Sequence, residues 1–145
     1  MWNGPDINPE FALDPDVTTR RVGTTFPGFL GFHVLEWGPD RVVGRMNLDD
    51  RHLHPGGYVH GGAWVGFADS LAGWATSRNI PQDWKFTTVE MKFNVFRASR
   101  AGDVMYGVAK PLHRGKRTQV WEVEVLIEEK LSANFICTQM LLPPK

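Results

Sequence analysis

The segment from Ala63 to Ala75 is the feature that most limits how this chain can fold. We predict a helix over residues 63–77, because apolar residues in this segment recur at helical spacing. They are spread around the whole circumference of that helix: Ala63, Trp64, Val65, Phe67, Ala68, Leu71, Ala72, Trp74 and Ala75. A helix that is apolar on every side is buried on every side. In a small domain, the remaining elements must therefore wrap around it.

The rest of the sequence supplies strands for such a wrapping sheet. Two short strands are predicted at residues 29–37 and 41–48, separated by the turn residues Gly38-Pro39-Asp40. After Pro81 the hydrophobic pattern has a period of two, and four strands are predicted at residues 87–97, 104–112, 118–128 and 131–142. In the first of these four, one face is expected to carry Thr87, Val89, Met91, Phe93 and Val95. Short connections favour antiparallel pairing, so the predicted fold class is α+β.

Length and composition are typical of one globular domain that neither spans a membrane nor binds nucleic acid. Residues 1–27 contain four of the ten prolines and are predicted to form an N-terminal arm with at most a short helix around residues 16–22. Residues 28–145 are predicted to form a single domain. Sixteen basic and sixteen acidic residues balance, which argues against nucleic-acid binding. No segment approaches the ~20 apolar residues of a membrane span.

The expected location is the cytoplasm. The first residues have neither the basic nor the apolar region of a secretory signal. Cys137 is the one cysteine, so neither an internal disulfide nor a cysteine-based zinc cage can form.

The start of the predicted helix combines two glycines with a single acidic residue further along. In His60-Gly61-Gly62, the glycines permit close approach to the first helical amides, where the positive end of the helix dipole favours a developing negative charge. Asp69 is the sole charged residue between Gly61 and Ser77. Burying a carboxylate is unfavourable unless it is paired or functional, and at this point both interpretations remain open.

The spacing of these groups predicts a homodimer if both act on one substrate. Asp69 follows Gly62 by seven residues, which is about 10 Å along a helix axis. A carbonyl held by the amides of Gly61 or Gly62 is therefore out of reach of Asp69 in the same helix. We expect each site to combine these groups from two protomers.

Four motifs in this order resemble a known family. They are Val59-His60-Gly61-Gly62 with an acidic residue nine positions after the His, the segment 88–94, Ala101-Gly102-Asp103, and the segment 111–117 leading into Trp121-Glu122. From about Phe29 to Leu142 the chain resembles the hot-dog-fold acyl-CoA thioesterases. Asp at position 69 is similar to the PaaI-like phenylacetate-degradation group. The segment 111–122 is similar to the 1,4-dihydroxy-2-naphthoyl-CoA group, which is related to the 4-hydroxybenzoyl-CoA thioesterases, and the subfamily stays open.

The resemblance implies roles for the residues around the helix start. It assigns the oxyanion-stabilising amides to Gly61 and Gly62, and places His60 just before them. Asp69 takes the place of the catalytic acid, either as general base for water or as nucleophile. His54 stands where the family usually has Asn or Gln, six residues before His60, contacting the thioester carbonyl or the water.

A basic turn is expected to bind the phosphates of coenzyme A, the alternative being a solvated turn. It consists of Arg114, Gly115, Lys116 and Arg117. Four further residues are expected near the substrate: Ser70 and Gly73 after Asp69 on the helix, and Val89 and Glu90 in the segment 88–94.

The expected reaction is hydrolysis of an aromatic or short- to medium-chain acyl-CoA. It needs no metal or redox cofactor, and coenzyme A is part of the substrate. No metal site is expected at His52, His54 and His60, because Pro55-Gly56-Gly57 places them in a loop.

Two other functions remain open at this point. One is a hot-dog dehydratase or hydratase acting on an acyl thioester, with His54 or His60 as its histidine. The other is a non-catalytic acyl-CoA-binding dimer. In each case we expect a homodimer, and a pair of such dimers as the larger assembly.

Overall fold

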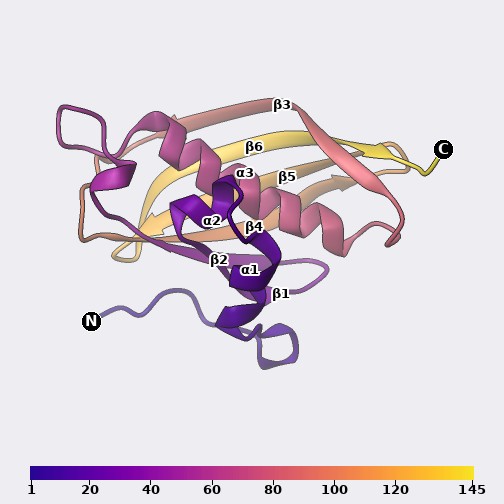
Figure 1. Cartoon of the computed structure of the whole chain (residues 1–145), viewed down its shortest axis with the longest axis horizontal. Coiled ribbons are helices and arrows are strands. Elements are labelled where there is room, and N and C mark those ends of the chain that lie inside the picture. The colour runs from indigo at the N-terminus through magenta and orange to yellow at the C-terminus, as the bar shows by residue number, and fades with distance from the viewer.

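A six-stranded antiparallel sheet curls around one long helix in the computed structural model, which describes residues 1–145 (Figure 1). The helix is α3, Gly61–Arg78. The strands are β1 (Phe32–Trp37), β2 (Val42–Asn47), β3 (Lys85–Val95), β4 (Val104–Arg114), β5 (Thr118–Ile127) and β6 (Lys130–Leu142). Their order in the sheet is β1-β2-β4-β5-β6-β3, and every neighbouring pair is antiparallel. The predicted α+β hot-dog architecture is confirmed.

The burial of α3 is as its apolar circumference predicts. The helix contacts all six strands on one side and the short helix α2 (Phe26–Leu30) on the other. Half of its residues are buried, among them the large side chains of Trp64, Phe67 and Leu71. None of the helices has the length and hydropathy needed to cross a lipid bilayer.

Two paired glycines let α3 lie directly on the sheet. Gly44 of β2 is opposite Gly107 of β4. A Cβ atom at Gly44 would lie 2.7 Å from Leu71 Cδ1, and one at Gly107 would lie 2.8 Å from Leu71 Cδ2 and from Phe67 Cε1. Both distances are shorter than real carbon contacts, so the helix occupies space that any other residue would fill.

The N-terminal residues are more structured than predicted. The expected short helix is confirmed as α1, Pro15–Val22. A second helix, α2, occupies residues predicted to begin the first strand. Its sequence favours a helix because Pro27 lies in the first turn and Gly31, with φ of 76°, ends it in the left-handed conformation. The predicted boundary between residues 27 and 28 lies inside α2.

The N-terminal segment also covers one edge of the sheet. The Leu13 amide donates to the Leu35 carbonyl, and Ala12 forms a β-bridge with Glu36. The Val34 amide donates to Thr18 Oγ1 over 2.9 Å. As a result, β1 has partners along both of its sides.

The alternation predicted for β3 is interrupted by a β-bulge. The register against β6 shifts between Thr88, which pairs with Gln139, and Glu90, which pairs with Thr138. Before the bulge, Thr88 faces α3, whereas after it the helix-facing positions continue with Met91 and Phe93. The prediction that Thr87 and Val89 share a face with Met91 is therefore wrong, because one extra residue shifts the alternation.

The close contact at the glycines gives a stability prediction. We expect Gly107→Ala to destabilise the fold by about 1–3 kcal/mol, because the added methyl group must displace Leu71 and Phe67. Gly73→Ala, on α3 itself, is the control: its Cβ would lie 3.5 Å from Phe86, an ordinary contact, and we expect a gain of about 0.5–1 kcal/mol. Urea unfolding measures both. Equal stability of Gly107→Ala and the wild type would contradict the packing described.

Candidate active site

Asp69 lies half-buried in α3 and faces β3. Its Oδ1 accepts a hydrogen bond of 2.8 Å from Thr88 Oγ1. Behind this pair, Thr88 Oγ1 lies 3.0 Å from the side-chain amide oxygen of the buried Gln139. No Lys, Arg or His forms an ion pair with Asp69. The sequence left open a buried, salt-bridged Asp, and the structure does not have that arrangement.

The surroundings of Asp69 make its carboxylate a stronger base than an exposed one. Burial raises the pKa of Asp69 above its ordinary value, and the hydrogen bond from Thr88 lowers the pKa by a smaller amount. A half-buried carboxylate with one hydroxyl partner and no cation combines incomplete solvation with a free oxygen, Oδ2. Perturbed acids of this kind are typical of catalytic sites.

The helix start presents one free amide instead of the predicted two. His60 is the N-cap of α3, and its Nδ1 accepts the Gly62 amide hydrogen over 2.8 Å. The Gly61 amide makes no hydrogen bond within the chain, and a Cβ atom at Gly61 would lie 3.8 Å from the ring of Phe93. An N-cap side chain commonly binds the second or third helical amide, which is why Gly62 and not Gly61 is used. Of the two predicted oxyanion amides, the Gly62 amide is therefore hydrogen-bonded to His60, whereas the Gly61 amide is free.

A single chain does not bring Gly61 and Asp69 together. Asp69 follows Gly61 by eight positions in α3, which is about 12 Å along the helix axis. They also face different parts of β3, with Asp69 beside Thr88 and Gly61 beside Phe93. The separation inferred from the sequence is therefore present in the structure.

The histidines before α3 have different environments. The buried His52 caps a short turn: its Nδ1 accepts from the Asp49 amide over 2.9 Å, and its Nε2 is 2.7 Å from the Leu30 carbonyl oxygen. His54 is half-buried, and its Nδ1 accepts from the Gly56 amide over 2.9 Å. An accepting Nδ1 places the hydrogen of a neutral ring on Nε2, so His54 retains one free donor. The structure contains no cluster of three or more His, Cys, Asp or Glu side chains that could hold a metal ion.

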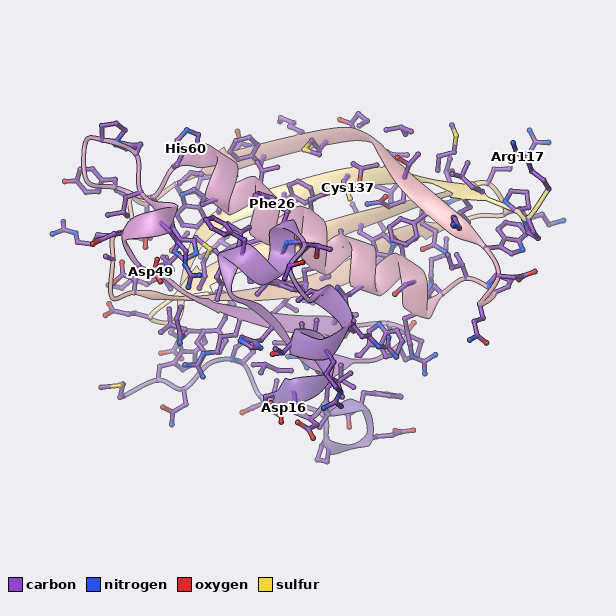
Figure 2. All side chains as sticks on the ribbon, in the orientation of Figure 1. Asp16, Phe26, Asp49, His60, Arg117 and Cys137 are labelled. Atoms are coloured by element: carbon purple, nitrogen blue, oxygen red, sulfur yellow. The ribbon has the colours of Figure 1, made fainter.

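The basic turn between β4 and β5 divides into a paired and an unpaired part. Arg114 forms an ion pair of 2.8 Å with Asp40 and donates to the Pro39 carbonyl. Lys116 and Arg117 are exposed and make no ion pair. Figure 2 shows Arg117 at the opposite end of the sheet from His60. The two free cations line a hollow of about 550 Å³ together with Trp84, Thr118, Met140, Leu141 and Pro143.

Of the four further residues predicted near the substrate, Ser70 and Gly73 lie within about one helical turn of Asp69 on α3. Ser70 and Gly73 line a groove on the adjoining face of α3, and Ser70 Oγ donates to the Gly66 carbonyl within the helix. Val89 lies in the bulge, and Glu90 points toward Thr138 on the outer face.

The residues that sequence reasoning missed are Thr88 and Gln139. Thr88 belongs to the segment 88–94 that carries the family resemblance, but the sequence predicts no role for it. Regular alternation placed Thr88 on the face opposite Thr87 and Val89, and no sequence signal marked the bulge.

Known proteins match both the sequence and the fold. A model of the thioesterase superfamily matches residues 56–133. A 1,4-dihydroxy-2-naphthoyl-CoA hydrolase of Escherichia coli is 37% identical over 102 residues, covering 70% of this chain and 74% of that protein. A mutant thioesterase structure from Pseudomonas aeruginosa has a TM-score of 0.84 at 25% identity, covering 91% of this chain and 96% of that chain. A mutant of the phenylacetic acid degradation protein PaaI from Thermus thermophilus has a TM-score of 0.74 at 30% identity, covering 79% and 96%.

The raised pKa of Asp69 predicts a stability effect with a defined pH dependence. Because the folded-state pKa exceeds the unfolded value of about 3.9, ionising Asp69 weakens the fold as the pH rises through the folded-state pKa. We expect Asp69→Asn to raise Tm at pH 7 by about 2–5 °C. Near pH 3 the gain should shrink, since the wild-type carboxyl is then largely protonated in both states.

The matched control for this measurement is Asp83→Asn, which changes an exposed carboxylate in the loop before β3. Thermal unfolding of the three proteins at both pH values gives the comparison. A lower Tm for Asp69→Asn at pH 7 would show that the carboxylate is stabilised by its surroundings.

Proposed function

The chain belongs to the thioesterase superfamily, and from this premise we propose that it hydrolyses an aromatic or short- to medium-chain acyl-CoA at Asp69. The resemblance inferred from the motifs is confirmed by the family match. The name of the Escherichia coli relative supports a coenzyme A ester as the substrate. The observation that carries the proposal is the half-buried Asp69 carboxylate, which has one hydroxyl partner, no counter-ion and a free oxygen.

A second copy of the chain completes the site in this proposal. The free edge of the sheet is β3, where Val89, Met91, Phe93 and Val95 are each about half exposed (39–50%). A long apolar edge strand readily pairs with another strand. Pairing of two β3 strands about a twofold axis extends the sheet and turns the two α3 helices antiparallel.

The contacts along β3 set the register of this pairing. Asp69 lies beside Thr88, and Gly61 lies beside Phe93. When Thr88 of one copy is opposite Phe93 of the other, each Asp69 faces the Gly61 amide of the partner copy. The twofold axis then passes near Glu90 and Met91, midway between the two positions.

The proposed reaction uses this pair of groups. The thioester carbonyl oxygen accepts the Gly61 N–H of one copy, which stabilises the negative charge of the tetrahedral intermediate. In one route, Asp69 Oδ2 of the other copy removes a proton from a water molecule while that water attacks the carbonyl carbon. In the alternative route, Oδ2 attacks the carbonyl carbon directly and forms an anhydride, which water then cleaves. Either route releases the carboxylic acid and the coenzyme A thiol.

The neighbouring groups position the reactants. The hydrogen bond from Thr88 fixes Oδ1 of Asp69 and leaves Oδ2 for the reaction. The His54 Nε2–H can donate to the carbonyl or the water, as the Asn or Gln of the family does. Neither route requires a metal or redox cofactor.

Lys116 and Arg117 are the proposed binding groups for the phosphates of coenzyme A. Both are unpaired, and they border the same hollow as the aromatic ring of Trp84. Arg114 instead orients the turn through its ion pair with Asp40.

The larger assembly is proposed to be a pair of dimers. Apolar side chains remain exposed on the outer face of the sheet, at Leu112, Leu131, Met140 and Leu142, and contact between two dimers would cover them. The proposed location is the cytoplasm, in keeping with acyl-CoA as the substrate.

Mixed dimers test the reaction and the shared site together. Gly61→Pro deletes the proposed amide donor at the first helical position, where proline is tolerated, and His60 already has the extended backbone that precedes proline. We expect Gly61→Pro to lower kcat about 10²–10³-fold and Asp69→Asn about 10²–10⁴-fold in thiol release from acyl-CoA. A dimer of one Gly61→Pro chain and one Asp69→Asn chain should recover about half of the wild-type activity, since one of its two sites is intact.

Gly61→Ala is the control, because it keeps the amide and its Cβ would lie 3.8 Å from Phe93, in ordinary contact. A mixed dimer as inactive as both parents would refute the shared site. Full activity of Asp69→Asn would refute the role of the carboxylate.

Disulfide formation tests the register of β3 pairing. We expect Met91→Cys to cross-link two chains under mild oxidation, because residues near the twofold axis approach within disulfide reach. Lys85→Cys should not, since it lies at the end of the strand. Both variants carry Cys137→Ala, because Cys137 is the β6 partner of Met91 and its thiol could otherwise pair with the new cysteine within one chain. Non-reducing gels measure the outcome, and cross-linking through Lys85→Cys but not Met91→Cys would contradict the register.

A further inference from the structure

A groove runs along α3 from the neighbourhood of Asp69 toward the C-terminal end of the helix. Its first part, of about 360 Å³, is lined by Ser70 and Gly73, which lie within about one helical turn of Asp69. Its second part, of about 550 Å³, extends to Trp84. Both parts share Arg21, Ser77 and Phe86, so they are continuous. Ser77 follows Ser70 by seven residues, so these two lining residues are about 10 Å apart along the helix axis.

Two arginines without counter-ions lie in this groove. The Arg21 guanidinium carbon is 4.8 Å from the ring centre of Trp37 and 5.4 Å from that of Trp74. The Arg78 guanidinium carbon is 5.7 Å from the Trp37 ring centre, and Arg78 Nε donates to the Trp37 carbonyl over 3.3 Å. Stacking on the tryptophans orients both cations and leaves N–H groups free for a ligand.

The groove has no negative charge of its own to balance these cations. None of its lining residues is Asp or Glu. Neither Arg21 nor Arg78 forms an ion pair, whereas Arg41, Arg51 and Arg114 each bind a carboxylate. The groove is therefore complementary to an anion, and a carboxylate suits the planar guanidinium groups.

We propose that the groove holds the acyl group of the substrate and that Arg21 and Arg78 bind a carboxylate at its far end. This inference rests on the proposed thioesterase reaction and specifies its substrate class, a dicarboxylic acid joined to coenzyme A through one of its carboxyl groups. Ser70, next to Asp69, and Ser77, which lines the groove with Arg21, are about 10 Å apart, and a span of this size corresponds to a medium-length chain.

An anion in this groove has two possible sources in the substrate, the acyl group and the phosphates of coenzyme A. The positions of three lining residues favour the acyl group. Arg21, Thr25 and Pro27 precede residues 56–133, the segment shared with the superfamily, so they suit the part of a substrate that differs among members. The phosphates have separate cations available in Lys116 and Arg117.

The matched substrates suberyl-CoA and octanoyl-CoA test the inference by turnover, since they differ only in a terminal carboxylate. We expect the wild type to prefer suberyl-CoA by at least about tenfold in kcat/KM, as a charge-assisted hydrogen bond would give. Arg21→Gln should reduce this ratio about tenfold, and Arg21→Lys should give an intermediate ratio. Arg20→Gln is the control, because Arg20 is exposed on the same helix and lies outside the groove, so its ratio should equal that of the wild type.

Binding of non-hydrolysable thioethers separates this inference from the reaction itself. Calorimetry with S-(7-carboxyheptyl)-CoA and S-octyl-CoA should show the same preference in the wild type and its loss in Arg21→Gln. Equal binding of the two thioethers by the wild type would overturn the inference, whatever the turnover. If Arg21→Gln weakened the binding of free coenzyme A as much as the binding of the carboxylated thioether, the groove would hold phosphate and the inference would be wrong.

The two proposals can fail independently. Preferential binding of the carboxylated thioether without hydrolysis of any ester would refute the proposed function and support the anion groove. Hydrolysis of octanoyl-CoA and suberyl-CoA with equal kcat/KM would support the thioesterase and refute the carboxylate specificity.

Discussion

The contact of Leu71 and Phe67 with the paired glycines Gly44 and Gly107 sets the depth at which α3 lies in the sheet. That depth determines the rest of the site, because Asp69 is on the same rigid helix. It brings the Asp69 carboxylate within hydrogen-bonding distance of Thr88 and partly out of water. A wider separation of helix and sheet would hydrate the carboxylate and return its pKa toward the ordinary value. The chemistry of Asp69 therefore depends on close packing at the two glycines.

Glu36 and Asp69 are both withdrawn from water, and their partners show which carboxylate is structural. Glu36, which is 2% exposed, accepts hydrogen bonds from Arg41 and from the Asn8 amide, and so its charge is compensated. Asp69 has a single hydroxyl and no cation. A fold that pairs one of these carboxylates with a cation and leaves the other without one retains instability at a particular place, which is characteristic of functional sites.

The sequence predicted those features that depend on one element and missed those that depend on contacts between elements. The apolar circumference of α3 predicted the wrapped sheet, and the isolated charge of Asp69 identified the candidate site. The bulge that turns Thr88 toward α3 follows from the register between β3 and β6, which no local pattern shows. Likewise, Arg114 could not be separated from Lys116 and Arg117 without the position of Asp40, which comes from a distant turn. The helix α2 was missed for a local reason, because the apolar run at residues 29–35 outweighed Pro27 and Gly31.

The placement of Arg21, one of the two proposed specificity residues, has a consequence for how this enzyme can vary. The proposed reacting groups, Asp69 and Gly61, are on α3, where a substitution disturbs the packing of six strands. Arg21 is on α1, which contacts β1 and α2 at the periphery of the fold. Substitutions there can alter which acyl group binds while the carboxylate, the free amide and the β3 edge keep their geometry. A shared catalytic core with a separate N-terminal wall is thus a physical basis for relatives that hydrolyse different thioesters.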